Sequence, residues 1–105
     1  MNREEFMREL MNNQLEDIKI VEKKNADYAD GEDPFQNFRV VERIGLCSTE
    51  LGIMVRLTDK LQRCANLLKR EAEVKDESIA DTLSDARNYL NILQVYLEKE
   101  KHDEQ

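Results

Sequence analysis

The chain has 105 residues, of which 40% are hydrophobic and 37% are charged, and its net charge is −7. This acidity argues against non-specific nucleic-acid binding, which needs clustered lysine and arginine. It is compatible with the binding of a small nucleotide. No stretch approaches the ~20 apolar residues of a membrane span, and the N-terminus lacks an apolar signal region. We therefore expect one cytoplasmic domain over residues 1–105, without a membrane partner.

Residues 3–25 predict the first helix. Its apolar side chains recur at steps of three and four residues, which places them on one helix face. They are Phe6, Met7, Leu10, Met11, Leu15, Ile18 and Val21. This face is wider than one neighbouring helix needs, and a chain this short buries a small fraction of its surface when alone. We therefore expect the N-terminal half of the helix to pack on another subunit in a homo-oligomer.

The segment 26–38 differs from an ordinary helix connection. It holds the chain's only proline, one of its three glycines and three of its six aromatic residues, Tyr28, Phe35 and Phe38. Its aspartate-glycine and aspartate-proline pairs indicate turns, so the first helix ends here. The concentration of rings, amides and acids makes this loop a candidate functional segment.

Three further helices follow the loop. A short one over 37–44 ends at Gly45, a long one has Ser48 as its N-cap, and the last begins near Asp76 or Ser78. The apolar faces of the two long helices consist of Ile53, Met54, Leu57, Leu61, Cys64 and Leu68, and of Ile79, Leu83, Ala86, Leu90, Leu93 and Leu97. Because strand-like alternation is lacking, we predict an all-α fold, a small antiparallel bundle of three long helices and a short one, completed by oligomerisation.

Histidine and cysteine chemistry has little support in this sequence. The only histidine, His102, lies in a charged tail over 99–105, which argues against His-based catalysis and His-rich metal sites. Cys47 and Cys64 have no CxxC spacing, and we interpret them as buried thiols in a reducing compartment.

The last long helix carries a stripe of oxygen-bearing side chains. At about 100° per residue, four of them fall on one narrow face over three turns: Glu77, Asp81, Asp85 and Asn88. The helix dipole favours acids in the first turn only, and like charges four residues apart repel one another unless a cation lies among them. The stripe therefore predicts a metal ion or a basic partner, with a solvated face as the alternative.

A further carboxylate, Glu50, lies in the middle of the apolar face of the preceding helix. A carboxylate that faces a core is costly unless it is paired or coordinated. Reaching across the bundle, it would complete an all-oxygen site suited to Mg²⁺ or Mn²⁺, made of Glu50, Glu77, Asp81 and Asp85. The alternative is that Glu50, in the first turn of its helix, lies near the end of the bundle and reaches water.

The polar face of the same helix carries Arg56, Asp59 and Arg63, with Lys60 at its edge. Such a series usually forms exposed ion pairs that contribute little to stability. The functional alternative is that one or two of these cations bind phosphates.

Four segments together resemble a known family: KNADY at 24–28, NFR at 37–39, RLTDKLxR at 56–63 and DESIADTLSDARNY at 76–89. They are similar to the small nucleotide-modification-associated domain of phages and prophages. The last segment is also similar to the third-helix signature of the all-α MazG-like nucleotide pyrophosphohydrolases. The similarity covers residues 20–97, and it implies an all-α nucleotide-handling domain that works in the host cytoplasm.

In the pyrophosphohydrolases, acids of two helices share Mg²⁺. The resemblance implies catalytic roles for Glu77 and Asp81, with Glu50 as the candidate from the preceding helix. Asp85 would be an extra ligand or a supporting acid. The chain departs from the family pattern because the E-x-x-E pair of the preceding helix is absent, which favours nucleotide binding over hydrolysis.

The same resemblance assigns roles to the loop. Rings offer faces on which a base stacks, with a contribution of ~1–3 kcal/mol, amides both donate and accept, and cations reach phosphates. The nucleotide-binding residues are then Lys24, Asn25, Tyr28, Asn37, Phe38, Arg39, Lys60, Arg63 and Asn88. A structural alternative, compatible with the first, is that Phe35 and Phe38 clamp the loop onto the core.

Three hypotheses about function follow. The first is a Mg²⁺-dependent nucleoside polyphosphate pyrophosphohydrolase, in which metal ions held by the acids activate water. The second is a protein without turnover that sequesters a nucleotide or a nucleotide signal. The third is a helical oligomerisation or adaptor module whose acid stripe faces a basic partner.

Overall fold

The computed structural model describes residues 1–28, 33–70 and 78–101, which form helices and turns with no strand among them. The helices are α1 (Arg3–Tyr28), α2 (Gln36–Arg43), α3 (Thr49–Lys69) and α4 (Ser78–Val95), and α4 continues into a π-helical turn, η1 (Tyr96–Glu100). The predicted all-α fold is confirmed. No helix within the described ranges has the length and apolar character needed to cross a membrane.

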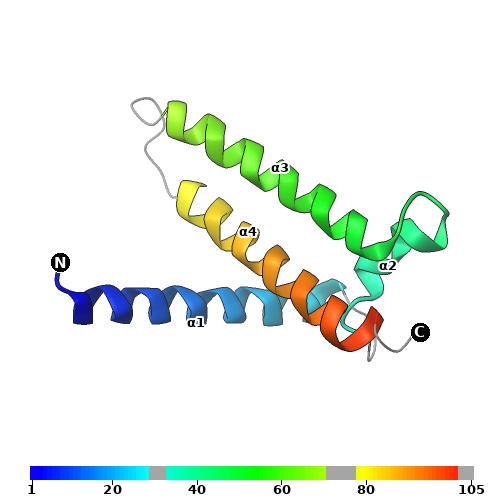
Figure 1. The fold of residues 1–105 in the computed structure, drawn as a ribbon, viewed down its shortest axis with the longest axis horizontal. Helices are drawn as coiled ribbons and strands as arrows, with labels where there is room; N and C mark the ends of the chain where they lie inside the picture. Colours follow the sequence, from blue (N-terminus) through cyan, green and yellow to red (C-terminus); the bar gives the residue numbers. More distant parts are fainter. Residues whose placement is uncertain (29–32, 71–77, 102–105) are drawn as a thin grey trace.

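The antiparallel pair of α3 and α4 forms the centre of the fold (Figure 1). The short helix α2 packs against the N-terminal end of α3. The long helix α1 crosses α4 at an angle, and its N-terminal half extends beyond the other helices (Figure 1). Three long helices and a short one are therefore present as predicted, but α1 packs on the others over part of its length only.

The helix ends follow from capping residues in the sequence. Asn2 caps α1, since its Oδ1 accepts a hydrogen bond of 2.8 Å from the backbone N–H of Glu5. Ser48 caps α3 in the same way, with a bond of 3.2 Å from Leu51. Gly45, which follows α2, has a φ of +83°, a left-handed conformation that glycine adopts without strain. The predicted cap at Ser48 and helix stop at Gly45 are confirmed.

The core is small and partly aromatic. Phe35, Ile53 and Tyr96 form its buried centre, and Phe38 is among the half-buried residues that pack around them. The rings of Phe35 and Tyr96 meet edge to face, with their centroids 5.5 Å apart. Phe35 thus clamps the end of the loop onto the core, as the structural alternative for this residue predicts.

The predicted core faces of α3 and α4 are only partly buried, and in this respect the prediction was wrong. On α3, Ile53, Leu57 and Cys64 are buried, whereas Met54, Leu61 and Leu68 are exposed. On α4 and η1, the exposed members are Leu83, Leu90 and Leu97. The reason is geometric, because each apolar face is wider than the surface that the neighbouring helices cover.

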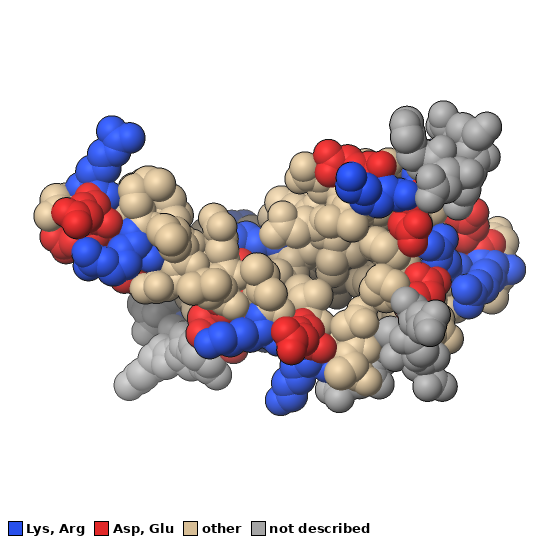
Figure 2. Space-filling model, turned by 90° about the horizontal axis from the view of Figure 1, so that it is seen from below, with Lys and Arg blue, Asp and Glu red and all other residues tan. Residues whose placement is uncertain are grey.

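The N-terminal half of α1 has the same property. Its large apolar side chains are between 37% and 61% exposed: Phe6, Met7, Leu10, Met11 and Leu15. Figure 2, which views the molecule from the side on which α1 lies, shows uncharged surface running between patches of charged side chains. The packing of this half-helix on another subunit stays a prediction.

A partly buried ion pair attaches α1 to α4. The carboxylate of Asp17, which is only 3% exposed, accepts hydrogen bonds from Nε and a terminal nitrogen of Arg87 at 2.6 and 2.9 Å. It also accepts a bond of 2.5 Å from Oγ of Ser84. The hydrogen bond from Arg87 lowers the pKa of Asp17, although burial of the carboxyl group acts in the opposite direction. We call these three residues the α1–α4 clip.

A close approach of α2 to α3 requires a glycine. A Cβ atom placed on Gly52 would lie 2.6 Å from Cγ2 of Val41, well inside van der Waals contact. Valine has a stiff χ1, so its side chain cannot easily turn away.

We expect Asp17→Asn to lower the free energy of unfolding by about 1–3 kcal/mol, since Arg87 loses a charged acceptor. The pKa of Asp17 is lower in the folded state than in the unfolded state. The ion pair of Asp17 therefore stabilises the fold fully above the unfolded pKa of about 3.9, and this stabilisation is lost as the pH falls through the pKa of the folded state. Urea denaturation at pH 7 and at pH 3 measures both effects. Glu16→Gln, which removes an exposed ion pair with Lys19, is the matched control and should change stability by less than about 0.5 kcal/mol. Equal losses in the two variants would contradict the role of the clip.

We expect Gly52→Ala to destabilise the fold by about 1–3 kcal/mol through overpacking. The double variant Gly52→Ala with Val41→Ala should recover part of this loss, because the second change removes the atom that the new methyl group meets. Thermal denaturation of the two variants tests this contact. A single variant as stable as the wild type would show that α2 moves away without cost.

Candidate functional site

A cavity of about 90 Å³ lies where side chains of all four helices meet. Five of the predicted nucleotide-binding residues line it, and Asp85 lies beside them: Lys24, Asn25, Asn37, Phe38 and Asn88. We call this space the inner cavity. Two of these residues come from α1, two from α2 and one from α4, so the fold brings together positions as far as 64 residues apart in the sequence.

Local contacts hold the residues of the inner cavity in place. The side-chain amide of Asn25 donates a hydrogen bond of 3.1 Å to the backbone oxygen of Pro34, which ties α1 to the segment before α2. The ring of Phe38 meets Tyr89 edge to face, with a centroid distance of 6.3 Å. The guanidinium carbon of Arg56 lies 4.8 Å from the centre of the Phe38 ring, within the range of a cation–π contact. Phe38 is therefore both a packing residue and part of the cavity wall.

A larger and mostly apolar cavity adjoins the inner cavity. Its volume is about 500 Å³, and it shares Asn25, Phe38 and Asn88 with the inner cavity. Aliphatic side chains such as Ile92 and Val95 cover much of its wall. The volume falls within the ~300–1,000 Å³ typical of small-molecule sites, which combine an apolar wall with a few polar groups.

A shallow groove of about 590 Å³ runs along the polar face of α3. It contains the predicted phosphate-binding residues Lys60 and Arg63. Arg56 and Tyr89 line both this basic groove and the inner cavity, so the two spaces are neighbours.

Asp85 connects the two spaces electrostatically. One of its oxygens lies 3.1 Å from Nζ of Lys24, and the other lies 3.0 Å from Nζ of Lys60. Burial by itself would raise the pKa of Asp85, but the hydrogen bonds from Lys60 and Lys24 outweigh it and lower the pKa. Asp85 is thus a charged carboxylate that holds one lysine from α1 and one from α3 at the mouth of the inner cavity.

Basic side chains are concentrated around the inner cavity and the basic groove, although the chain as a whole is acidic. Among the described residues that line the inner cavity and the basic groove, two are acidic, Asp59 and Asp85, and five are basic, Lys24, Arg56, Lys60, Arg63 and Arg70. The excess of three positive charges among these residues contrasts with the net charge of −7 of the chain. An anion would therefore be attracted here in spite of the overall charge.

The described members of the predicted metal site are not gathered. Glu50 forms an ion pair with Lys101, beyond η1, whereas Asp85 bonds to Lys24 and Lys60, so the two acids lie several helical turns apart. Asp81 is exposed on the first turn of α4, and Glu77 lies outside the described residues. Within residues 1–28, 33–70 and 78–101 there is no group of three potential metal ligands. These residues do not fit the predicted four-carboxylate site, and the Mg²⁺ or Mn²⁺ site stays a prediction.

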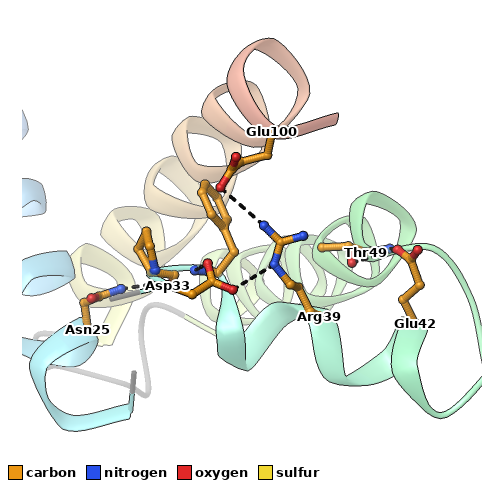
Figure 3. Close-up of polar contacts among 8 residues, drawn as sticks. Asn25, Asp33, Arg39, Glu42, Thr49 and Glu100 are labelled. Carbon is orange, nitrogen blue, oxygen red and sulfur yellow. Dashed lines mark hydrogen bonds and ion pairs between the residues drawn. The ribbon is translucent and has the colours of Figure 1, made fainter. Parts of the chain in front are cut away.

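Two predicted nucleotide-binding residues, Arg39 and Tyr28, are not among the described residues that line the two cavities and the basic groove. Arg39 lies apart, where its guanidinium group bonds to Asp33 at 2.9 Å and to Glu100 at 3.3 Å (Figure 3). Burial opposes its charge, but the hydrogen bond to Asp33 raises the pKa of Arg39 further. This arginine joins the loop end to η1. Tyr28 is the last residue of α1, and its side chain lies outside what the structure describes.

Neighbouring polar contacts complete this junction. Glu42 of α2 accepts hydrogen bonds from the backbone N–H and Oγ1 of Thr49 at 2.8 and 2.9 Å, so it helps to begin α3 (Figure 3). The backbone hydrogen bond from Thr49 is the main reason for the lowered pKa of Glu42.

Sequence reasoning missed several residues of the site. Tyr89 lines two of the spaces but was not predicted to bind a ligand, and Arg56, which lines the same two, was named only among the cations of which one or two would bind phosphates. Both occur in the quoted family-like segments, so that resemblance was a signal for them. Asp17 had no such signal, because one acid on a helix surface looks the same in sequence whether it is solvated or buried.

Comparisons with protein-family models, with curated proteins and with solved structures gave no match to this chain. The resemblance to nucleotide-handling families therefore rests on the quoted residues.

The lysine pair at Asp85 generates a prediction that distinguishes two roles of this acid. If Asp85 occupies the lysines that would bind phosphate, Asp85→Asn should bind inorganic pyrophosphate several-fold more tightly, because Lys24 and Lys60 lose their anionic partner. Isothermal titration calorimetry with and without Mg²⁺ measures this. Asp59→Asn, at an acid of the basic groove, is the control for a general change in charge. A Mg²⁺-dependent loss of affinity in Asp85→Asn would instead identify Asp85 as a metal ligand.

Proposed function

We propose that this protein binds a nucleotide, with the base in the inner cavity and the apolar cavity beside it, and the phosphates over the basic groove. One observation carries the proposal. Lys24, Asn25, Asn37, Phe38 and Asn88, which come from three helices, line the same small space next to a groove containing Lys60 and Arg63.

The chemistry of the two spaces suits the two ends of a nucleotide. Phe38 and Ile92 provide apolar surface for a base, and the amides of Asn25 and Asn88 can donate to and accept from its edge. The excess positive charge near Asp85 suits phosphates, which also bind arginine through paired hydrogen bonds. Because the spaces share Arg56 and Tyr89, one ligand of nucleotide length can occupy both.

The arrangement of the described acids favours retention of the nucleotide over its hydrolysis. Glu50 is engaged by Lys101, and both oxygens of Asp85 are engaged by lysines. A nucleotide-sequestering protein therefore fits the geometry better than a pyrophosphohydrolase with its acids grouped around a metal.

The decisive experiment is incubation of the purified protein with a panel of nucleoside mono-, di- and triphosphates, with and without Mg²⁺. Chromatography of the supernatant and of ligand released by heat then identifies the products. Recovery of intact, bound nucleotide supports sequestration, whereas Mg²⁺-dependent formation of monophosphate and pyrophosphate supports hydrolysis. If no nucleotide of the panel is bound or converted, both sequestration and hydrolysis are rejected, and the adaptor hypothesis is left.

Two substitutions test the two halves of the site. Phe38→Leu keeps apolar packing but removes the ring, so we expect about tenfold weaker binding of a nucleotide and unchanged binding of pyrophosphate. Arg63→Gln should weaken pyrophosphate and nucleoside triphosphates alike, by about three- to tenfold, and leave nucleoside binding unchanged. Fluorescence or calorimetric titration measures the affinities, with Arg8→Gln on the far half of α1 as the control. The opposite pattern, with Phe38→Leu acting on pyrophosphate, would contradict the proposed orientation.

A further inference from the structure

The exposed face of α3 carries a regular apolar pattern. Six small or apolar residues follow one another at steps of three, four, three, four and three: Leu51, Met54, Thr58, Leu61, Ala65 and Leu68. This is the a/d spacing of a coiled coil. All six are exposed, and the four large ones are between 40% and 61% exposed. We call this row the α3 seam.

The α3 seam is distinct from the face that α3 turns towards α4. Ile53, Leu57 and Cys64 are buried and form their own row at steps of four and seven. A helix with two apolar rows, of which one is covered, has the pattern of a bundle with more helices than the chain supplies.

The molecule exposes more surface than a compact monomer of its size, and the half of α1 that extends beyond the other helices accounts for part of this excess (Figure 1). The chain exposes 8115 Å², about 2,000 Å² more than the ~6,100 Å² expected for a compact monomer of 12.4 kDa. Its radius of gyration is 15.9 Å, against about 13 Å for a compact domain of this length. A standard interface removes about 800 Å² from each partner. The excess surface is therefore large enough for an interface of standard size.

We propose that the α3 seam pairs with the α3 seam of a second copy of this chain, in the antiparallel direction. Antiparallel pairing sets Met54 against Ala65 and Thr58 against Leu61 of the second copy, with Leu51 against Leu68 at each end. Each inner layer then combines a large side chain with a small one, which fills the seam evenly. Parallel pairing would set Thr58 and Ala65 against themselves and leave thin layers.

The adjacent helix extends this interface. Leu83 and Leu90 of α4 and Leu97 of η1 recur every seven residues and are exposed. They lie on the flank of α4 away from Asp85, whereas Lys60, which bonds to Asp85, marks the polar flank of α3. The α3 seam and the α4 leucines thus lie on the same side of the helix pair. Two such surfaces together give a four-helix bundle of α3 and α4 from each copy.

This pairing leaves the proposed nucleotide site open. Arg56, Arg63 and Arg70 recur every seven residues and, at about 100° per residue, lie on the side of α3 opposite the seam. All three line the basic groove. A dimer formed through the α3 seam therefore presents two grooves on its outer faces, and the inference does not depend on what the grooves bind.

The first test is the mass of the protein in solution, by sedimentation equilibrium at micromolar concentration. We expect twice 12.4 kDa for the wild type and half of that value for Leu61→Glu, which places a charge in the middle of the seam. Ile44→Glu, at a similarly exposed apolar position in the turn after α2, is the matched control and should remain dimeric. A monomeric wild type, or dissociation caused by Ile44→Glu and not by Leu61→Glu, would overturn the proposal.

The second test does not depend on the folding of a charged variant. In a Cys47→Ser background, the double variant Leu51→Cys with Leu68→Cys should form a covalent dimer under mild oxidation, because antiparallel pairing brings the two positions together. The single variant Leu51→Cys should stay monomeric on a denaturing gel, since the two copies of this position lie about 25 Å apart along the helices. Cross-linking of the single variant, or no cross-linking of the double variant, contradicts antiparallel pairing.

Discussion

The attachment of α1 to α4 by Asp17, Ser84 and Arg87 is the contact on which the rest of the arrangement depends. No part of the N-terminal half of α1 is buried, so this helix has few apolar contacts to hold it. This charge pair defines both the position of α1 along its axis and its rotation, because the fork of Arg87 meets the buried carboxylate of Asp17 with two hydrogen bonds. Two turns further along α1, Lys24 and Asn25 reach the inner cavity only because the clip sets this register.

The candidate site is consequently a product of three helix contacts rather than of one motif. Lys24 from α1 and Lys60 from α3 are joined through Asp85 on α4, while Asn25 is tied to the segment before α2. The side chain of Asp85 is the most covered of the three, at 20% exposed, so its charge would be costly without the two lysines. A ligand phosphate would have to take the place of the Asp85 carboxylate at one of the lysines, and that exchange would select for strongly charged anions.

The sequence was a good guide wherever a local physical rule determines the structure. The Ser48 cap, the Gly45 stop and the all-α class follow from hydrogen-bonding groups and periodicity that act within a few residues. Periodicity also identified the apolar residues of α3, but it could not tell which row a neighbour covers, so Met54 and Leu61 were assigned to the core. The same limit applies to Glu50, whose partner Lys101 is 51 positions away. A helical wheel records the direction of a side chain and not what it meets.

Residues 96–101 have a consequence for how local damage would spread through the fold. Within this short stretch, Tyr96 packs on Phe35, Glu100 bonds to Arg39, and Lys101 bonds to Glu50. The segment before α2, α2 itself and the first turn of α3 therefore each have a partner in the same six residues. A cut made before Tyr96 would remove all three partners at once and would leave the ring of Phe35 without its cover.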